Sequence, residues 1–144
     1  MDCIDIKILD ILQNEGRVTM KELGQRVGLT SPATIERVKK LEESGIIDGY
    51  KAVLNTKLAG LPLRVFILLT LGDNNADRFS ELVNHHPSII NCHRVAANVS
   101  HLLEAVLPDT QGLEKLLDEL AVLGKTEPLV VLSSPLKRKS VSLL

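Results

Sequence analysis

The spacing of the apolar residues changes once along this chain of 144 residues, and this change limits the possible folds more than any other feature. Before residue 45, apolar side chains such as Ile4, Ile8 and Leu12 recur every three to four positions, a period typical of amphipathic helices. From Leu63 to Leu71 nearly every residue is apolar, which is typical of a buried strand. The sequence therefore predicts a helical unit followed by a unit that contains a sheet.

Helix-ending and helix-starting residues divide the first 44 residues into three short helices. The first helix is expected to end at residues 14–16, Asn-Glu-Gly. Thr19 and Glu22 have the spacing of a capping box and predict the start of the second helix, which Gly28 ends. The third helix is predicted to run from Thr30 or Ser31 to Ser44. A helical wheel places three of its residues on the buried face: Ile35, Val38 and Leu41.

The rest of the chain predicts the element order βαββαβ. Strands are expected at Leu63 to Leu71, Ile89 to Val95, Leu102 to Leu107 and Leu129 to Ser133, and helices at Ala76 to His86 and Leu113 to Leu123. This order is typical of a ferredoxin-like domain, in which a four-stranded antiparallel sheet carries both helices on one face. The segment Ile46 to Leu54 is interpreted as extended, and residues 55–62 as a linker.

Two helices joined by a tight corner at residues 28–30, with a third helix before them, are the elements of a helix-turn-helix. From Arg17 to Leu41 six basic residues oppose two acidic ones, although the whole chain has a formal net charge of −1. Small residues at the start of the third helix allow close approach to bases, and long cations further along can reach guanine edges or phosphates. A solvated surface helix is the alternative interpretation. The predicted DNA-contacting residues are Lys21, Ser31, Ala33, Thr34, Glu36, Arg37 and Lys40.

Four segments resemble the Lrp/AsnC (feast/famine) transcriptional regulators, and the chain length is similar to that of LrpC-like members. The segments are Ile4 to Leu9, Val27 to Thr30, Ile35 to Glu42, and Gly45 to Tyr50. The resemblance implies an α+β fold, with a winged-type helix-turn-helix in residues 1–60 and a ferredoxin-like domain for dimerisation and effector binding in residues 61–144. It also implies a recognition helix at about residues 31–44, a strand at Ile47 to Leu54, and dimers that often form tetramers or octamers. The expected function is transcription regulation on double-stranded DNA, in the cytoplasm and associated with the nucleoid.

The first predicted strand is apolar on both faces, whereas the helices of a ferredoxin-like domain cover only one face of the sheet. A second copy of the chain is the simplest cover for the other face. The alternative is the tail from Leu136 to Leu144, which carries Val141 and Leu143. The basic run Lys137-Arg138-Lys139 is interpreted as a solvated turn rather than a second DNA contact.

The turn between the second and third predicted strands departs from the family that the chain resembles. Those proteins usually have Gly-x-x-Asp there, close to an amino-acid effector held between subunits. This chain has Ala97, Asn98, Val99 and Ser100, without the glycine that lets a ligand approach the backbone and without the carboxylate that meets an α-amino group. We therefore expect a weak or absent response to amino acids, with Ala97, Asn98 and Ser100 as candidate contacts for any effector.

Enzymatic motifs are missing from the sequence. It contains no HExxH, GxSxG or P-loop, and its two cysteines form no CxxC pair, so no catalytic residue, metal site or cofactor is predicted. Two alternatives remain: an architectural protein that bends or wraps DNA without an effector, and an enzyme subunit similar to sirohaem decarboxylases, which resemble the same architecture and use histidines near a tetrapyrrole. The longest apolar run, Val65 to Leu71, is too short to span a bilayer, and the acidic start differs from a signal peptide. No membrane partner is expected.

Overall fold

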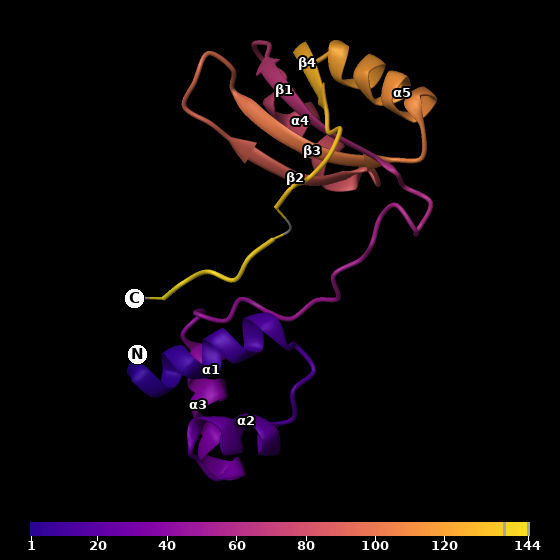
Figure 1. Cartoon of the computed structure of the whole chain (residues 1–144). Coiled ribbons are helices and arrows are strands. Elements are labelled where there is room, and N and C mark those ends of the chain that lie inside the picture. The colour runs from indigo at the N-terminus through magenta and orange to yellow at the C-terminus, as the bar shows by residue number, and fades with distance from the viewer. Residues whose placement is uncertain (137, 144) are drawn as a thin grey trace. The chain divides into compact units, whose positions relative to one another are not determined.

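The computed structural model describes residues 1–136 and 138–143, which form two compact units (Figure 1). Met1–Val53 and the tail from Leu136 make up the first unit, and Leu54–Pro135 the second. The predicted division at residue 60 would place the tail with the second unit instead. In the described ranges no helix is both long and apolar enough to cross a membrane.

The first unit consists of three helices and the tail. The helices are α1 (Cys3–Asn14), α2 (Met20–Val27) and α3 (Ser31–Glu43). The predicted capping box is present at α2, where the Thr19 side chain accepts from the backbone N–H of Glu22 and the Glu22 carboxylate accepts from the backbone N–H of Thr19. Gly28 ends α2 in the left-handed conformation with φ of 76°. These caps explain why the predicted helix boundaries are confirmed to within one or two residues.

The buried face of α3 differs from the prediction by one residue. Thr34 is fully buried beside Val38 and Leu41, whereas Ile35 is 51% exposed. The reason is the close approach of α2, because a Cβ atom on Gly24 would lie 2.7 Å from Thr34 Oγ1. A compact threonine fits this contact, and its hydroxyl donates to the carbonyl of residue 30 over 2.9 Å. The prediction that Ile35 is buried was wrong.

No strand forms between α3 and Leu54 in the described part of the chain, contrary to the predicted strand at Ile47 to Leu54. Ile47 donates its backbone N–H to the carbonyl of Leu41, 3.1 Å away. The Tyr50 hydroxyl donates to Glu42 Oε1 at 2.9 Å, and burial together with this carboxylate raises the pKa of Tyr50 to about 12. An extended segment becomes a strand only when a neighbouring strand pairs with its backbone.

In the described residues, the C-terminal tail lies along α1 of the first unit. The Gln13 side chain binds both backbone groups of Val141, with Nε2 donating to the carbonyl at 3.1 Å and Oε1 accepting from the N–H at 2.7 Å. Ser140 Oγ donates to Asn14 Oδ1 at 2.9 Å, and Leu143 packs against the core of the first unit. These contacts use Val141 and Leu143 within the first unit, so they do not support the alternative in which the tail shields the sheet. Leu144, which belongs to that alternative, and Lys137 of the basic run lie outside the described residues.

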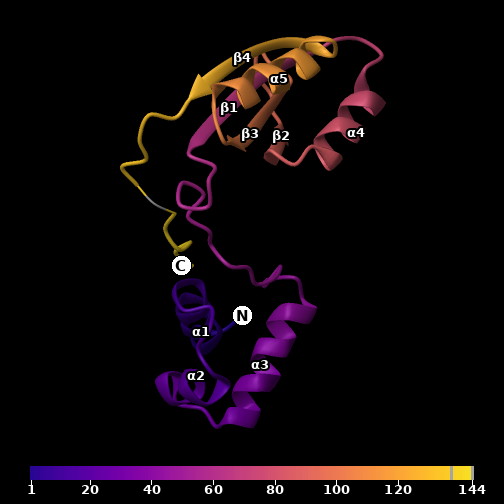
Figure 2. The same ribbon diagram turned by 90° about the vertical axis from the view of Figure 1, so that its right-hand side faces the viewer.

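The second unit has the predicted order βαββαβ. Its elements are β1 (Leu63–Leu71), α4 (Ala76–His85), β2 (Ile89–Arg94), β3 (His101–Leu107), α5 (Thr110–Ala121) and β4 (Gly124–Val130). All strand pairs are antiparallel, and the strand order is β2-β3-β1-β4, with β2 and β4 at the edges (Figure 2). The fold is α+β, and the predicted ferredoxin-like arrangement is confirmed.

The last strand lies earlier in the chain than the predicted Leu129 to Ser133. In β4, Gly124 pairs with Leu71 and Val130 pairs with Val65. Most of β4 is exposed, so its residues need not be apolar, and an edge strand tolerates the missing N–H of Pro128. The apolar run that guided the prediction marks only the end of the strand.

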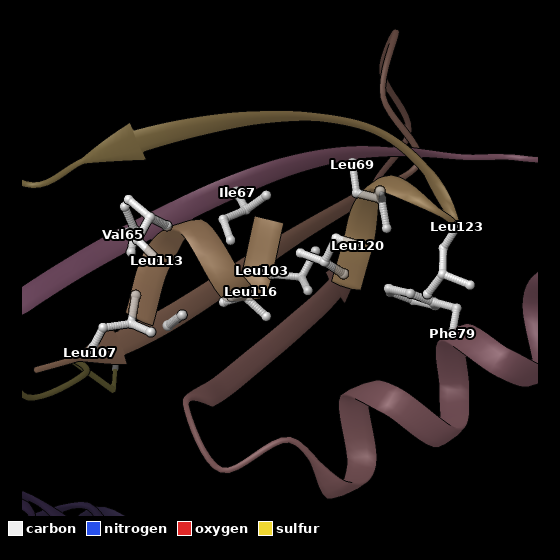
Figure 3. Close-up of a cluster of buried hydrophobic side chains, with 11 residues drawn as sticks. Val65, Ile67, Leu69, Phe79, Leu103, Leu107, Leu113, Leu116, Leu120 and Leu123 are labelled. Carbon is white, nitrogen blue, oxygen red and sulfur yellow. The ribbon is translucent and has the colours of Figure 1, made fainter. Parts of the chain in front are cut away.

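Helices α4 and α5 cover one face of the sheet, as Figure 3 shows for the side chains that meet there. On this face Val65, Ile67 and Leu69 are fully buried against the helices, with Phe79 contributed by α4. The residues that alternate with them point to the other face. They include Phe66, Leu68 and Leu102, which are half-buried, and Leu129, which is 44% exposed.

Candidate nucleic-acid interface

The corner between α2 and α3 is tightly fixed. The backbone N–H of Leu29 donates to the carbonyl of Gly24 at 2.8 Å, and Thr30 caps α3 by accepting from the N–H of Ala33. The absence of a side chain at Gly24 lets Leu29 and Thr34 approach closely. Helices α2 and α3 therefore form a rigid helix-turn-helix, in which the second helix is the one that enters the major groove in DNA-binding proteins.

Arg37 joins α3 to the start of α1. Its Nη1 atom lies 2.7 Å from Asp2 Oδ2 and 2.8 Å from Asp5 Oδ1. The pKa of Asp2 falls to about 2, mainly because its carboxylate accepts from the backbone N–H of Asp5 and also because it pairs with Arg37. The same carboxylates raise the pKa of Arg37. Arg37, predicted to contact DNA, is thus paired with two carboxylates of the first unit.

Three other predicted contacts lie on the flank of α3 that borders α1. Ala33, Glu36 and Lys40, together with Met1 and Ile46, line an open hollow of about 550 Å³. Lys40 Nζ lies 2.9 Å from Glu36 Oε1, and this pairing lowers the pKa of Glu36. Both side chains are about 70% exposed, so the pair adds little to stability and can rearrange when an anion approaches.

The outward face of α3 includes residues that the sequence did not assign to it. Pro32, Ile35 and Lys39 are exposed, and Lys39 Nζ lies 3.5 Å from Glu43 Oε1. Thr34, predicted to contact DNA, is fully buried and cannot do so. The pattern Thr34, Val38, Leu41 has helical spacing as good as the predicted one. The one sequence signal for the observed face is Gly24 in α2. A glycine there indicates that α3 comes close and places a small side chain opposite it.

The other predicted contacts are accessible to different extents. Lys21 is exposed in the first turn of α2, and Ser31 is half-buried at the start of α3. Lys21, Ser31 and Lys40 therefore lie on the same helix-turn-helix, which leaves cationic and small polar side chains available to a polyanion.

The turn between β2 and β3 holds the candidate effector residues. Ala97 and Asn98 are exposed, whereas Ser100 is half-buried. Ser100 Oγ donates to the carbonyl of Leu69 and accepts from the N–H of Leu71, both at 2.9 Å. The hydroxyl thus fastens the turn to β1, and it is less available to a ligand than the sequence implied. Within residues 1–136 and 138–143, no three His, Cys, Asp or Glu side chains are grouped to hold a metal ion.

Comparison with known protein families defines the class of this two-unit molecule. Residues 1–48 match the model of a winged helix-turn-helix DNA-binding domain, and residues 64–141 match the Lrp/AsnC ligand-binding domain. The combination is that of a DNA-binding transcriptional regulator with a ligand-binding domain. The chain belongs to the Lrp/AsnC family.

Individual relatives support this assignment over most of the chain. The chain is 37% identical over 134 residues to the uncharacterized HTH-type transcriptional regulator YezC of Bacillus subtilis, covering 93% of this chain and 95% of the relative. It is 38% identical over 120 residues to the leucine-responsive regulatory protein of Haemophilus influenzae, covering 81% and 72%. These relatives are named as regulators, which favours a regulator over the decarboxylase-like alternative.

Solved structures show the same fold over nearly the full length. The structure of B. subtilis LrpC gives a TM-score of 0.91 at 28% identity and covers 96% of this chain and 99% of that one. The complex of the transcriptional regulator NMB0573 from Neisseria meningitidis with L-Met gives 0.91 at 28% identity, covering 98% and 96%.

Proposed function

We propose that this regulator binds double-stranded DNA by placing the outward face of α3 in the major groove. The observation that carries the proposal is the rigid corner of α2 and α3, which buries Thr34 and leaves Lys39 and Lys40 exposed on α3. Ser31 and Ala33 let the first turn approach base edges, and Lys21 reaches the phosphate backbone from α2. The protein is cytoplasmic and associated with the nucleoid, and it is not an enzyme.

The DNA-binding form is a homodimer, and dimers assemble into tetramers or octamers. Support comes from the sheet face opposite α4 and α5, which presents Phe66, Leu68 and Leu129 incompletely buried. An isologous contact between two such faces buries these side chains without a different partner. Two helix-turn-helix units per dimer then contact two half-sites.

A titration of duplex DNA at fixed salt tests the proposed interface. The double variant Lys39→Ala/Lys40→Ala is expected to bind about tenfold more weakly or worse, because each dimer loses four cations next to the phosphates. The control is Lys115→Ala/Lys125→Ala, which removes the same charge from exposed positions of the second unit. Equal affinities of the two double variants would show that α3 is not the DNA-binding element.

Free amino acids are expected to change DNA affinity by less than about threefold. The NMB0573 complex contains L-Met, but in this chain the turn lacks the glycine and the carboxylate, and Ser100 is bonded to β1. A ligand without differential contacts between two states cannot shift their equilibrium. Calorimetry with a panel of amino acids checks this. A saturable micromolar site coupled to DNA binding by about 1 kcal/mol or more would contradict it and would direct attention to Ala97 and Asn98.

An architectural role is the second candidate function. The turn between β2 and β3, which lacks the glycine and the carboxylate, favours this role, because a protein that bends or wraps DNA needs no effector. The two candidates differ in how many genomic sites they occupy.

A further inference from the structure

One apolar side chain stands on the face of α3 that is turned to solvent. Ile35 is 51% exposed, and Pro32 and Lys39, about one turn before and after it, are exposed as well. Thr34, and not Ile35, is buried on the inner face of α3. Because the packing of α3 does not use Ile35, its side chain is available to an apolar group on a binding partner.

The chemistry of the major groove supplies such a group. Of the four bases only thymine carries a methyl group on its major-groove edge, and apolar side chains contact it directly. Ile35 is in the first half of α3, which spans Ser31–Glu43, and recognition helices contact base edges with their N-terminal residues. The side chain is thus placed where an apolar contact distinguishes one base from the others.

We propose that Ile35 is a specificity-determining residue that selects thymine by contact with its C5-methyl group. This inference rests on the proposed function, in which α3 enters the major groove. A second copy of the same surface is a poorer occupant, because Ile35 is a single exposed large apolar side chain on α3, next to the exposed charged residues Glu36 and Lys39, and it buries too little area for a stable contact between copies. The exposed Lys39 and Lys40 on the same helix attract DNA.

The experiment removes the methyl group from the DNA and the side chain from the protein. The wild-type chain first enriches duplexes from a random pool, and each thymidine of the enriched site is then replaced by deoxyuridine, which lacks only the methyl group. We expect one or two positions per half-site at which the wild type binds about fourfold more weakly, the factor that follows from the loss of one buried methyl group.

The variant Ile35→Ala is expected to bind the thymidine and deoxyuridine duplexes equally at those positions. Val122→Ala, which shortens an exposed apolar side chain beyond α5 in the second unit, is the matched control and should keep the wild-type preference. Thermal melting checks that both variants are folded.

Four results would overturn the inference. If Ile35→Ala keeps the full preference for thymidine, or if no thymidine matters to the wild type, Ile35 does not read the methyl group. If Ile35→Ala changes the sedimentation coefficient but not the base preference, the side chain contacts a second copy of the chain. If the wild type enriches no duplex at all, the proposed function fails together with this inference.

Discussion

The affinity for duplex DNA is expected to fall by about 10³- to 10⁵-fold when salt rises from 50 to 200 mM, the range for a protein that contacts 6–10 phosphates. The reason is the set of exposed cations on the first unit, Arg17, Lys21, Lys39 and Lys40. With these four side chains in each of its two chains, a dimer can displace counterions from this number of phosphates. Fluorescence anisotropy titrations at four or more salt concentrations give the slope.

The dimer is an essential part of this expectation, because one unit alone presents too few cations. Sedimentation velocity at micromolar concentration tests it on the same sample. A stable monomer with a slope of about half the expected one would refute both the dimer and the role assigned to the face with Phe66, Leu68 and Leu129. The variant Lys39→Ala/Lys40→Ala should reduce the slope by about two to four phosphate contacts.

Replacement of Gly24 by alanine is expected to lower the free energy of unfolding of the first unit by about 1–3 kcal/mol. In an open helix the same substitution stabilises by up to about 1 kcal/mol. Here the added Cβ would lie 2.7 Å from Thr34 Oγ1 and 2.8 Å from the carbonyl oxygen of Leu29, which is a backbone atom. The corner must therefore open, and DNA affinity should fall with it.

Tyrosine fluorescence during urea unfolding measures this effect selectively, because Tyr50 is the single tyrosine and the chain has no tryptophan. Gly16→Ala in the same unit is the matched control. Its Cβ would meet nothing within 4 Å, so the first unit should tolerate the substitution. If Gly24→Ala and Gly16→Ala behaved alike, the close approach of α2 and α3 would not be what fixes the corner.

Features decided by neighbouring residues could be predicted from the sequence. The capping box of Thr19 and Glu22 and the left-handed Gly28 set the ends of α2 without reference to the rest of the fold. The apolar run of β1 had the predicted bounds, because a central strand buried by helices must be apolar throughout.

Features decided by distant contacts could not be predicted. The rotation of α3 depends on Gly24 of α2, and the pairing of Arg37 with Asp2 and Asp5 depends on how α1 packs. For this reason the sequence placed Thr34 among the DNA contacts and missed Ile35 and Lys39. The tail follows α1 because Gln13 pairs with the backbone of Val141, and no local pattern shows that.

A genome-wide footprint of the bound protein shows whether this regulator binds chromosomal DNA through α3. Wild type and Lys39→Ala/Lys40→Ala are crosslinked to chromosomal DNA in parallel, with Lys115→Ala/Lys125→Ala as the control. We expect a limited number of sharp sites with two related half-sites, present in the control and lost in the α3 variant. Broad coverage of curved or A-tract-rich DNA, or sites that persist in the α3 variant, would contradict it.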